Sequence, residues 1–420
     1  MRIMVVTAGS RGDVAPYTGL ARRLSEAGHH VAFATHHTFA DMVRAGGFDV
    51  RTLPGDPQEL IRARTEGRSE AEKQRVTAEF LSNLGEGVAE AAEQGTDVIL
   101  SSLGQAPLSC LVAEGLGLPS MGVYLAPAVP NDAFALPGSD PDGRGTPLSN
   151  RAAGERTLDR AHALYAEVLP RLARRLGLPE AAVGAAWRRW QGKEGWPISH
   201  GVSPAVLPRP ADWPPEVDMA GYWWPETETE PGSALTSSWQ PPEELRSFLA
   251  AGPPPVFLGF GSMAPGLGER LGPLIVDAVR RSGTRAVVQA GWAGLDVAGD
   301  QVLTIGDVPH DWLFPRMAAV VHHAGAGTTA AGLRAGAPTV AVPVMADQPF
   351  WASRVYELGA GPAPVPFGEL SAERLGEAIR TAVEERGYRR RAAELAHRIG
   401  MDDGAGRVLR RVESLAAATA

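Results

Sequence analysis

The amino-acid sequence predicts an α/β protein made of two doubly wound halves, each a parallel β-sheet covered by helices. Short β-branched runs alternate with Ala-, Leu- and Arg-rich stretches that carry apolar residues at helical spacing, a pattern typical of βαβ units. The pattern occurs twice, before and after a proline-rich stretch at 204–255. A chain of 420 residues fits two such domains, each large enough to bury its own core.

The first half begins directly with a strand pattern. We predict strands at Ile3–Thr7, His30–Thr35, Phe48–Leu53, Asp97–Ser102 and Ser120–Ala126, with amphipathic helices between them. From about Asn150 to Trp196 a long, Arg-rich helical pattern interrupts this alternation. We expect that stretch to be an insertion that covers the N-terminal half of a ligand cleft.

The second half repeats the alternation. Its strands are predicted at Val256–Phe260, Arg285–Gln289, Val302–Ile305, Ala319–His323 and Thr339–Val344. Proline excludes helix interiors and central strands, so we expect neither in the proline-rich stretch at 204–255.

We therefore divide the chain into two domains and a linker. The predicted ranges are an N-terminal domain at 1–218, a linker at 219–240, a C-terminal domain at 241–400 and a C-terminal helix at 401–420. A return of that helix to the N-terminal domain is one alternative. The ligand is expected in a cleft between the two domains that face each other, at the carboxyl ends of the strands.

Composition excludes several classes of function. The 40 Lys and Arg against 48 Asp and Glu give a net charge of −8 without a basic block, so we expect no nucleic-acid partner. Cys110 is the single cysteine, which excludes an intrachain disulfide framework and fits a reducing, cytoplasmic location. No apolar run reaches the roughly 18 residues that a membrane span requires, and the N-terminus does not resemble a signal peptide.

The loop Thr7–Pro16 is the first of two loops that carry chemistry. Its glycines allow a tight turn, and Pro16 is expected in the first turn of the helix that follows. Asp13 has two interpretations: a cap for that helix, or a carboxylate that accepts a proton from a substrate hydroxyl at the end of the first strand.

The second loop follows the strand Ala319–His323. Its glycines and hydroxyls stand where a helix begins, which is what a phosphate or diphosphate requires. His323 can add a hydrogen bond, although a strand-end histidine satisfied by the backbone is the alternative. The same loop also matches the glycine pattern of dinucleotide-binding sites, but so does the segment from Gly259 to Ala264. A pattern that occurs twice by chance in one glycine-rich chain is weak evidence for a dinucleotide site.

Five motifs in order along the chain resemble one known family. They are G-S-R-G-D-V-A-P at 9–16, G-F-G-S-M at 259–263, D-V-P-H-D-W-L-F-P-R at 307–316, H-H-A-G-A-G-T-T at 322–329 and R-A-G-A-P-T-V-A-V-P-V-M-A-D-Q-P-F at 334–350. The sequence resembles the GT-B glycosyltransferases that use nucleotide sugars, especially the microbial branch that glycosylates natural products such as glycopeptide antibiotics, and the related sterol glucosyltransferases. The resemblance covers nearly the whole chain and implies the GT-B fold.

The resemblance also implies roles for individual residues. Asp13 would be the general base, and Arg11 would lie near the leaving phosphate. The other positions implied in donor binding are Gly261, Ser262, Trp292, Val308, His323, Gly325, Ala326, Gly327, Thr328, Asp347 and Gln348. Within this set the loop at 323–328 would hold the diphosphate, the backbone of Val308 the base, and Asp347 with Gln348 the sugar hydroxyls.

The implied reaction is an inverting transfer to a small lipophilic acceptor without a metal or other cofactor. The donor would be a TDP- or UDP-sugar, and the D-x-D at Asp140 to Asp142 is interpreted as a turn. A sterol-type acceptor, a nucleotide-sugar epimerase and a non-catalytic nucleotide-sugar-binding protein remain alternatives. The family mostly has glycine where this chain has Ala324. The oligomeric state cannot be predicted.

Two groups of tryptophans have open interpretations. Trp187 and Trp190 stand at helical spacing in the insertion, where they either pack in the core or line a site for an apolar acceptor. Trp223, Trp224 and Trp239 lie in or beside the linker, and we expect them to hold the two domains together.

Overall fold

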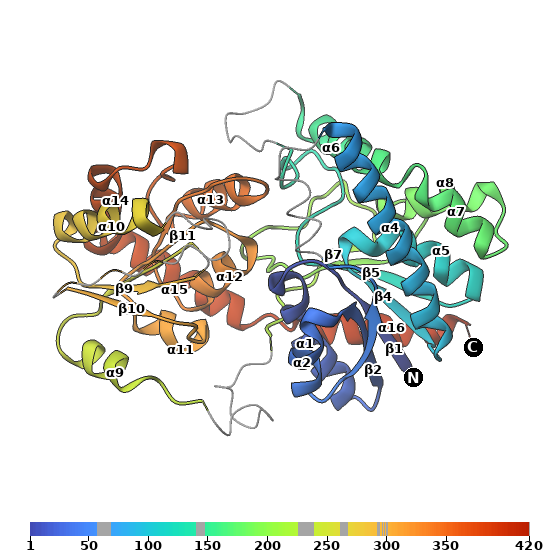
Figure 1. The fold of residues 1–420 in the computed structure, drawn as a ribbon, viewed down its shortest axis with the longest axis horizontal. Helices are drawn as coiled ribbons and strands as arrows, with labels where there is room; N and C mark the ends of the chain where they lie inside the picture. The colour runs from blue at the N-terminus through green and yellow to red at the C-terminus, as the bar shows by residue number, and fades with distance from the viewer. Residues whose placement is uncertain are drawn as a thin grey trace. The chain divides into compact units, whose positions relative to one another are not determined.

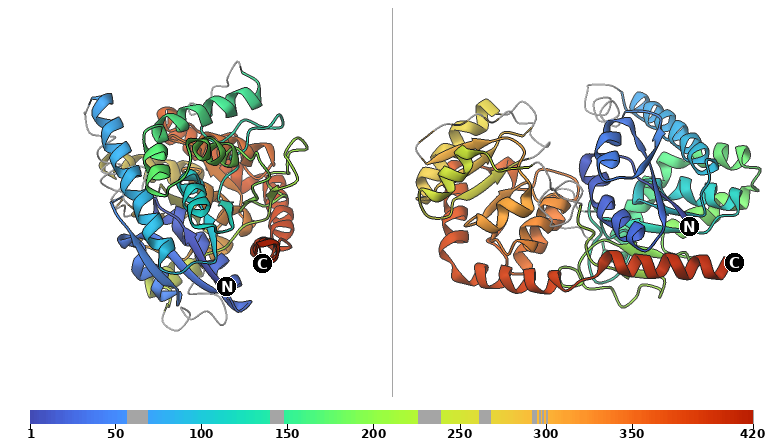
Figure 2. Two further views of the ribbon diagram at one scale, coloured as in Figure 1. Left: turned by 90° about the vertical axis from the view of Figure 1, so that its right-hand side faces the viewer. Right: turned by 90° about the horizontal axis from the view of Figure 1, so that it is seen from below.

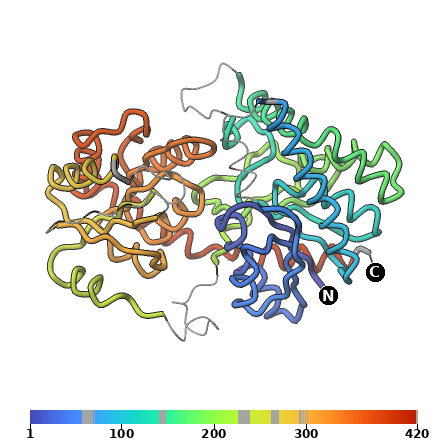
Figure 3. Tube along the Cα trace, viewed as in Figure 1, coloured from blue at the N-terminus to red at the C-terminus, as the bar shows by residue number. Residues whose placement is uncertain are grey.

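The computed structural model describes residues 1–56, 69–139, 148–225, 239–260, 268–291, 295, 297, 299 and 301–419. These residues form two compact units. Unit 1 contains the described residues up to Ser139, those from Leu148 to Pro225 and those from Asp402 onward, whereas unit 2 contains those from Trp239 to Met401. The first residues and the last helix therefore belong to the same unit (Figure 3).

Unit 1 is built on a seven-stranded sheet in which all neighbouring strands are parallel. Across the sheet the strands are β3 (Asp49–Leu53), β2 (His30–His36), β1 (Arg2–Val6), β4 (Val98–Ser101), β5 (Ser120–Tyr124), β6 (Ile198–His200) and β7 (Val217–Met219). The order reverses between β1 and β4, which makes their carboxyl ends the switch point where ligands bind in such sheets.

Helices cover both faces of this sheet (Figure 1). They are α1 (Arg11–Glu26), α2 (Ala40–Ala45), α4 (Glu70–Glu93), α5 (Ala106–Leu116), α6 (Asn150–Tyr165), α7 (Val168–Arg175), α8 (Glu180–Trp190) and α16 (Gly404–Thr419), with short turns η1 (His37–Phe39) and η2 (Leu103–Gln105). Ile3 and Val5 of β1 point into one core with α1 and α16, because alternate side chains of a strand point to the same face. Figure 2 shows α16 lying along unit 1.

Unit 2 is built on a smaller parallel sheet of five strands. They are, in order, β10 (Val302–Ile305), β9 (Ala286–Gln289), β8 (Val256–Gly259), β11 (Val320–His322) and β12 (Thr339–Ala341). The first five strands of unit 1 have the same order, so the two sheets are wound in the same way. The switch point here lies between β8 and β11.

The helices of unit 2 also lie on both faces of its sheet (Figure 1). They are α9 (Glu243–Ala250), α10 (Gly268–Ser282), α11 (His310–Leu313), α12 (Ala326–Arg334), α13 (Gln348–Glu357), α14 (Ala372–Glu384) and α15 (Arg386–Gly400), with turns η3 (Phe314–Arg316) and η4 (Phe367–Glu369). Val256 and Leu258 pack against α10 and α14, whereas Phe257 packs toward α9 and α11. The α/β class with two doubly wound parallel sheets is thus confirmed.

The predicted strands all occur, with ends that shift by a few residues. The expectation that neither a helix nor a central strand forms within 204–255 is wrong at one place, since α9 lies there, whereas β7 in the same stretch is not a central strand. β7 is an edge strand of three residues, a position that nearby prolines allow, and α9 begins directly after Pro242, where a missing N–H costs nothing.

The tryptophans beside the linker pack within single units. Trp223 is 3% exposed and lies in the core of unit 1, where its ring centroid is 5.7 Å from that of Tyr17. Trp239 packs on Trp312 in unit 2, with ring centroids 5.4 Å apart. Trp224 lies against Tyr222 of its own unit, with ring centroids 4.9 Å apart and the ring planes tilted. These ring contacts stabilise each unit. The expectation that the same side chains also hold the two domains together stays a prediction.

Candidate functional site

The loop after β1 in unit 1 turns sharply into α1. Gly9 has a φ of 140°, in the region that favours glycine, and a Cβ there would lie 2.4 Å from Asp13 Oδ2. Ser10 is the N-cap of α1, so Asp13 is the third residue of the helix. Pro16 consequently lies inside α1, beyond the first turn that the sequence predicted for it.

The Asp13 carboxylate closes the helix N-terminus through one oxygen. Oδ2 accepts hydrogen bonds from the Ser10 backbone N–H at 2.7 Å and from the Ser10 hydroxyl at 2.8 Å. Oδ1 has no hydrogen-bond partner within the described ranges. The side chain is exposed at the surface, yet desolvation by the surrounding protein raises the pKa of Asp13, which the two Ser10 bonds oppose. The residue therefore caps α1 and still presents one oxygen that can accept a proton.

The η2 turn lies across the switch point from this loop, after β4. The Ser102 N–H bonds the Val6 carbonyl, which joins the two loops. Two aromatic side chains of the insertion hold the turn: Trp190 Nε1 donates to the Leu103 carbonyl at 2.9 Å, and the Tyr165 hydroxyl donates to the Gly104 carbonyl. Because Trp190 is 4% exposed, the core interpretation of this tryptophan is confirmed.

In unit 2 the turn from β11 to α12 is the counterpart of the Asp13 loop. Ala324 is fully buried and has a φ of 62°. Gly325 is the N-cap of α12 and supplies no side-chain cap, so no N-cap side chain accepts the first N–H groups of this helix. A Cβ on Gly325 would lie 2.6 Å from His323 Nε2, which explains why this position is glycine.

The two histidines of this turn are neutral near pH 7. Burial lowers the pKa of His323 to about 4 and that of His322 to about 3. His323 Nδ1 and the Thr329 hydroxyl are buried without hydrogen-bond partners in the described structure. Backbone N–H groups at a helix N-terminus, with a neutral imidazole beside them, form an arrangement that can bind a phosphate group.

The turn from β12 to α13 places Asp347 and Gln348 at the same edge of the sheet. Gln348 is 3% exposed, and its Oε1 accepts the N–H groups of Val344 and Met345 at 2.8 and 3.1 Å. Asp347 is the N-cap of α13, and its Oδ2 accepts the Trp351 indole N–H at 2.9 Å. Gln348 thus shapes the turn, and Asp347 is held in a fixed orientation by Trp351.

The remaining predicted residues divide into described and undescribed ones. Val308 is 7% exposed and packs in a core of unit 2, while the preceding Asp307 accepts a hydrogen bond from Gln289 Nε2 at 3.1 Å. Arg11 is exposed at the start of α1, and Gly327 is exposed with open space around its Cα. Ala326 and Thr328 belong to the first turn of α12. Gly261, Ser262, Trp292 and the D-x-D at 140–142 lie outside the described residues.

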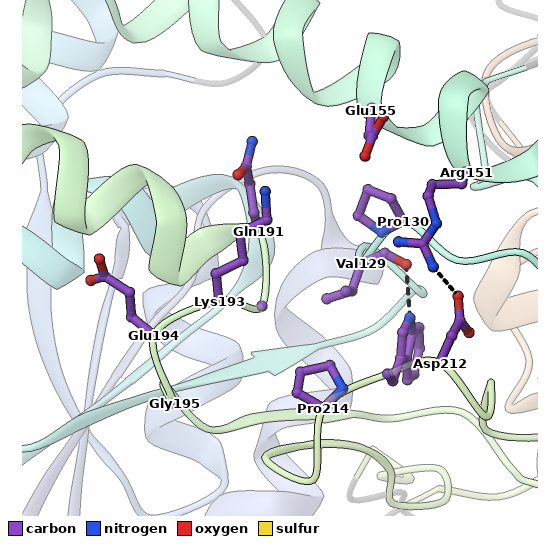
Figure 4. Close-up of a pocket in the computed structure, with 12 residues that line it drawn as sticks. Val129, Pro130, Arg151, Glu155, Gln191, Lys193, Glu194, Gly195, Asp212 and Pro214 are labelled. Atoms are coloured by element: carbon purple, nitrogen blue, oxygen red, sulfur yellow. Dashed lines mark hydrogen bonds and ion pairs between the residues drawn. The ribbon is translucent and has the colours of Figure 1, made fainter.

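Unit 1 also contains a pocket that the sequence did not indicate (Figure 4). Its volume is about 230 Å³, and α6, the loop before β6 and the loop before β7 line it. Arg151 forms ion pairs with Asp132 and Asp212 at its wall, and Trp213 Nε1 donates to the Val129 carbonyl at 3.0 Å. The lining carries charges of both signs, so it favours no single class of ligand.

Within the described ranges no three His, Cys, Asp or Glu side chains are grouped so that they could hold a metal ion. Nor does any helix there combine the length and apolar character of a membrane span.

Comparison with known proteins gives the family. Residues 3–92 match the model of the glycosyltransferase family 28 N-terminal domain, and residues 287–415 match that of the erythromycin biosynthesis protein CIII-like C-terminal domain. The O-mycaminosyltylonolide 6-deoxyallosyltransferase of Streptomyces fradiae is 33% identical over 421 residues, which cover 96% of this chain and 95% of that protein. The chain belongs to the GT-B glycosyltransferases.

Other relatives of this glycosyltransferase are named as sterol glucosyltransferases. A sterol 3-beta-glucosyltransferase of Arabidopsis thaliana is 35% identical over 421 residues, covering 96% of this chain. The chain spans 66% of the length of that relative. The family resemblance inferred from the five motifs is confirmed.

Solved structures support the fold of this glycosyltransferase. The calicheamicin glycosyltransferase CalG4 has a TM-score of 0.71 at 19% identity and covers 99% of this chain and 98% of its own. The glycosyltransferase VinC in complex with DTDP has a TM-score of 0.67 at 20% identity, covering 99% of this chain and all of the other. The GT-B fold predicted from the resemblance is confirmed.

Sequence reasoning missed some structural residues of this glycosyltransferase. The sequence assigns His322 no role beyond its place in a motif. In the structure its ring bonds the backbone of the turn, since Nδ1 accepts the Ala324 N–H at 3.0 Å. Gln289, predicted only as the last residue of a strand, donates a hydrogen bond from Nε2 to Asp307 Oδ1 at 3.1 Å. The doublet His322-His323 was a signal, but spacing does not reveal which histidine faces inward, because that depends on the pleat at the strand end.

Proposed function

We propose that this glycosyltransferase transfers a sugar from a TDP- or UDP-linked donor to a hydroxyl or similar nucleophile of a small lipophilic acceptor. Asp13 is the general base, the transfer inverts the anomeric carbon, and no metal takes part. The observation that carries the proposal is the pair of strand-end sites among the described residues: a carboxylate after β1 with one oxygen unpaired there, and an α12 N-terminus after β11 whose N-cap supplies no side-chain cap. Both lie at the switch points of their sheets.

The proposed chemistry follows from these groups. Asp13 Oδ1 accepts the proton of the acceptor hydroxyl while that oxygen attacks the anomeric carbon of the donor. The bond from the anomeric carbon to the diphosphate oxygen breaks, and the nucleoside diphosphate leaves with the electron pair. Stabilisation of that leaving charge is assigned to the α12 N–H groups, His323 and Arg11.

Donor recognition is assigned to the remaining loops of the proposed site. Asp347 and Gln348 bind the sugar hydroxyls, and the backbone at Val308 binds the base. Gly325, Ala326, Gly327 and Thr328 surround the diphosphate, joined by Gly261, Ser262 and Trp292. The complex of VinC with DTDP supports a thymidine donor, and a UDP-sugar is the second candidate.

The acceptor class has two supported candidates. The relative from Streptomyces fradiae is named for a macrolide acceptor, and that from Arabidopsis thaliana is named for a sterol. We therefore place macrolide aglycones and sterols at the centre of the acceptor panel. The proposed localisation is the cytoplasm.

The test is a matrix of TDP- and UDP-sugars against acceptors of both classes, read by the mass added to the acceptor. We expect a hexose or deoxyhexose mass gain that persists with a chelator, and an anomeric proton coupling that shows inversion. Nucleoside diphosphate release without an acceptor, accompanied by an altered sugar, would instead indicate an epimerase. If no acceptor in the panel gains mass while nucleotide still binds, the result would support a non-catalytic nucleotide-sugar-binding protein.

A further inference from the structure

His322 occupies an unusual position for a polar side chain. It is the last residue of β11, pairs with Gly259 and Ala341 on either side, and is fully buried. Within the described residues its ring makes one hydrogen bond, which is local: Nδ1 accepts the backbone N–H of Ala324 at 3.0 Å. Because Nδ1 is the acceptor, the ring proton of the neutral imidazole lies on Nε2.

The second ring nitrogen shows that packing alone does not explain this histidine. Nε2 is buried and has no hydrogen-bond partner in the part of the chain that is described. An unpaired buried donor is costly, and an apolar side chain of similar size would avoid that cost. Apolar packing alone therefore does not account for a histidine at this position, and the remaining polar contact of its ring is the bond of Nδ1 to Ala324.

The bond acts on a strained point of the backbone. Ala324 has a φ of 62°, a left-handed conformation that a residue with a Cβ rarely adopts. Its N–H is bound from one side by His322, and the chain leaves it directly into Gly325, the N-cap of α12. The direction in which α12 begins depends on this turn.

The same turn also sets the position of His323. The His323 ring lies over Gly325, with Nε2 at 2.6 Å from the place of a Cβ on that glycine. A change at Ala324 therefore moves both the imidazole of His323 and the first N–H groups of α12. These are the groups assigned above to the leaving diphosphate.

We propose that His322 is a positioning residue for the donor diphosphate: its Nδ1 holds Ala324 in the left-handed conformation and thereby fixes His323 and the α12 N-terminus. The inference rests on the proposed function, since it concerns the same site. His322 itself does not touch the donor. Its effect passes through the backbone of Ala324.

The electrostatic surroundings keep Nδ1 available as an acceptor. Burial, with His323 and His310 nearby, lowers the pKa of His322 to about 3. The ring therefore stays neutral throughout the pH range in which enzymes are assayed. A protonated ring would carry hydrogens on both nitrogens and could not accept the Ala324 N–H.

Two polar substitutions separate the role of Nδ1 from that of side-chain size. In H322N the amide oxygen can occupy the place of Nδ1, whereas in H322Q the amide group extends to the place of Nε2. Titration calorimetry with TDP and UDP is expected to give H322N an affinity close to that of the unmodified chain. H322Q and H322L are expected to bind about tenfold more weakly or worse, the cost of a lost hydrogen bond plus a relaxed turn.

A second change tests whether the effect passes through Ala324. Glycine adopts a positive φ without strain, so A324G in the background of H322L is expected to recover most of the lost affinity. Donor KM should follow the nucleotide affinity, whereas kcat at saturating donor should change less. Circular dichroism and thermal unfolding of each variant identify any that do not fold, in which case H322N and H322N/A324G carry the comparison with the unmodified chain.

The outcomes separate this inference from the proposed function. If the unmodified chain binds neither TDP nor UDP, the proposed function fails and this inference with it. If it binds them and H322Q and H322L bind equally well, the proposed function stands and the positioning role is wrong. Equal losses in H322N, H322Q and H322L, without recovery by A324G, would also overturn it, since they would indicate a packing role.

Discussion

Asp13 shows how one side chain can serve both structure and chemistry. Its Oδ2 takes both hydrogen bonds from Ser10 and closes the N-terminus of α1, while Oδ1 stays unpaired within the described ranges. The sequence offered cap and base as alternatives, but the two oxygens of a carboxylate allow both. Gly9 is required for this arrangement because a Cβ there would collide with the carboxylate.

The raised pKa of Asp13 predicts the pH dependence of transfer. Desolvation places the pKa of this carboxyl above the ordinary aspartate value of about 3.9. A base acts only when deprotonated, so kcat/KM is expected to be constant near pH 7–8 and to fall about tenfold per pH unit below that pKa. The measurement is kcat/KM for the acceptor at saturating donor. A profile that stays flat below pH 4 would show that Asp13 is not the base.

The strand-to-helix turns are the elements that organise both candidate sites. In unit 1 the turn is closed by Asp13, whereas in unit 2 the corresponding turn has Gly325 as N-cap and no side-chain cap. A side-chain cap accepts hydrogen bonds from N–H groups at a helix N-terminus. Without such a cap, these N–H groups can donate hydrogen bonds to a ligand. This difference supports the assignment of the diphosphate to unit 2.

Gly325→Ala tests the turn between β11 and α12. The added Cβ would lie 2.6 Å from His323 Nε2, so the imidazole must move. We expect TDP and UDP affinity to fall about tenfold or more, a loss that corresponds to the overpacking of a tight site. Gly400→Ala at the end of α15, where the Cβ meets nothing within 4 Å, is the matched control. Unchanged affinity in Gly325→Ala would contradict the assignment of this turn.

Much of the element layout follows from the sequence, and the exceptions have physical reasons. Strands such as Val302–Ile305 are continuous β-branched runs between helical patterns, which makes their limits clear. The sequence patterns do not predict β6 and β7 because each has only three residues, and β7 also lies among prolines, which argue against a central strand. The Ala324 turn was noted only as a departure from glycine, because a backbone conformation is not visible in residue types.

At the scale of the whole molecule the two units are built separately, and the chain returns to the first at its end. α16 follows α15 of unit 2 in the sequence but belongs to unit 1, where Val408, Leu409 and Val412 pack in the core with α1. The last helix is thus part of the unit that carries Asp13. Sequence patterns placed a helix at the end of the chain, yet its partner depends on packing that no local pattern encodes.

Val412→Asp is expected to destabilise unit 1 selectively. The side chain is fully buried and packs in the core that α16 shares with α1. An unpaired carboxylate there is expected to lower the free energy of unfolding by about 3–5 kcal/mol. Hydrogen exchange should accelerate in α1 and β1, while amides of β11 and β12 keep their rates. Arg410→Ala on the exposed side of α16 is the control. Equal acceleration in both units would contradict separate cores.

The most direct test of the central claim is Asp13→Asn, measured for transfer and for nucleotide binding in the same preparation. The amide oxygen can keep the bonds from Ser10, so the helix cap survives while the base is lost. We expect turnover to fall by about 10²–10⁴-fold with TDP or UDP affinity nearly unchanged. Asp49→Asn, at the opposite end of the sheet on β3, should behave like the unmodified chain. Near-normal turnover in Asp13→Asn would contradict the account.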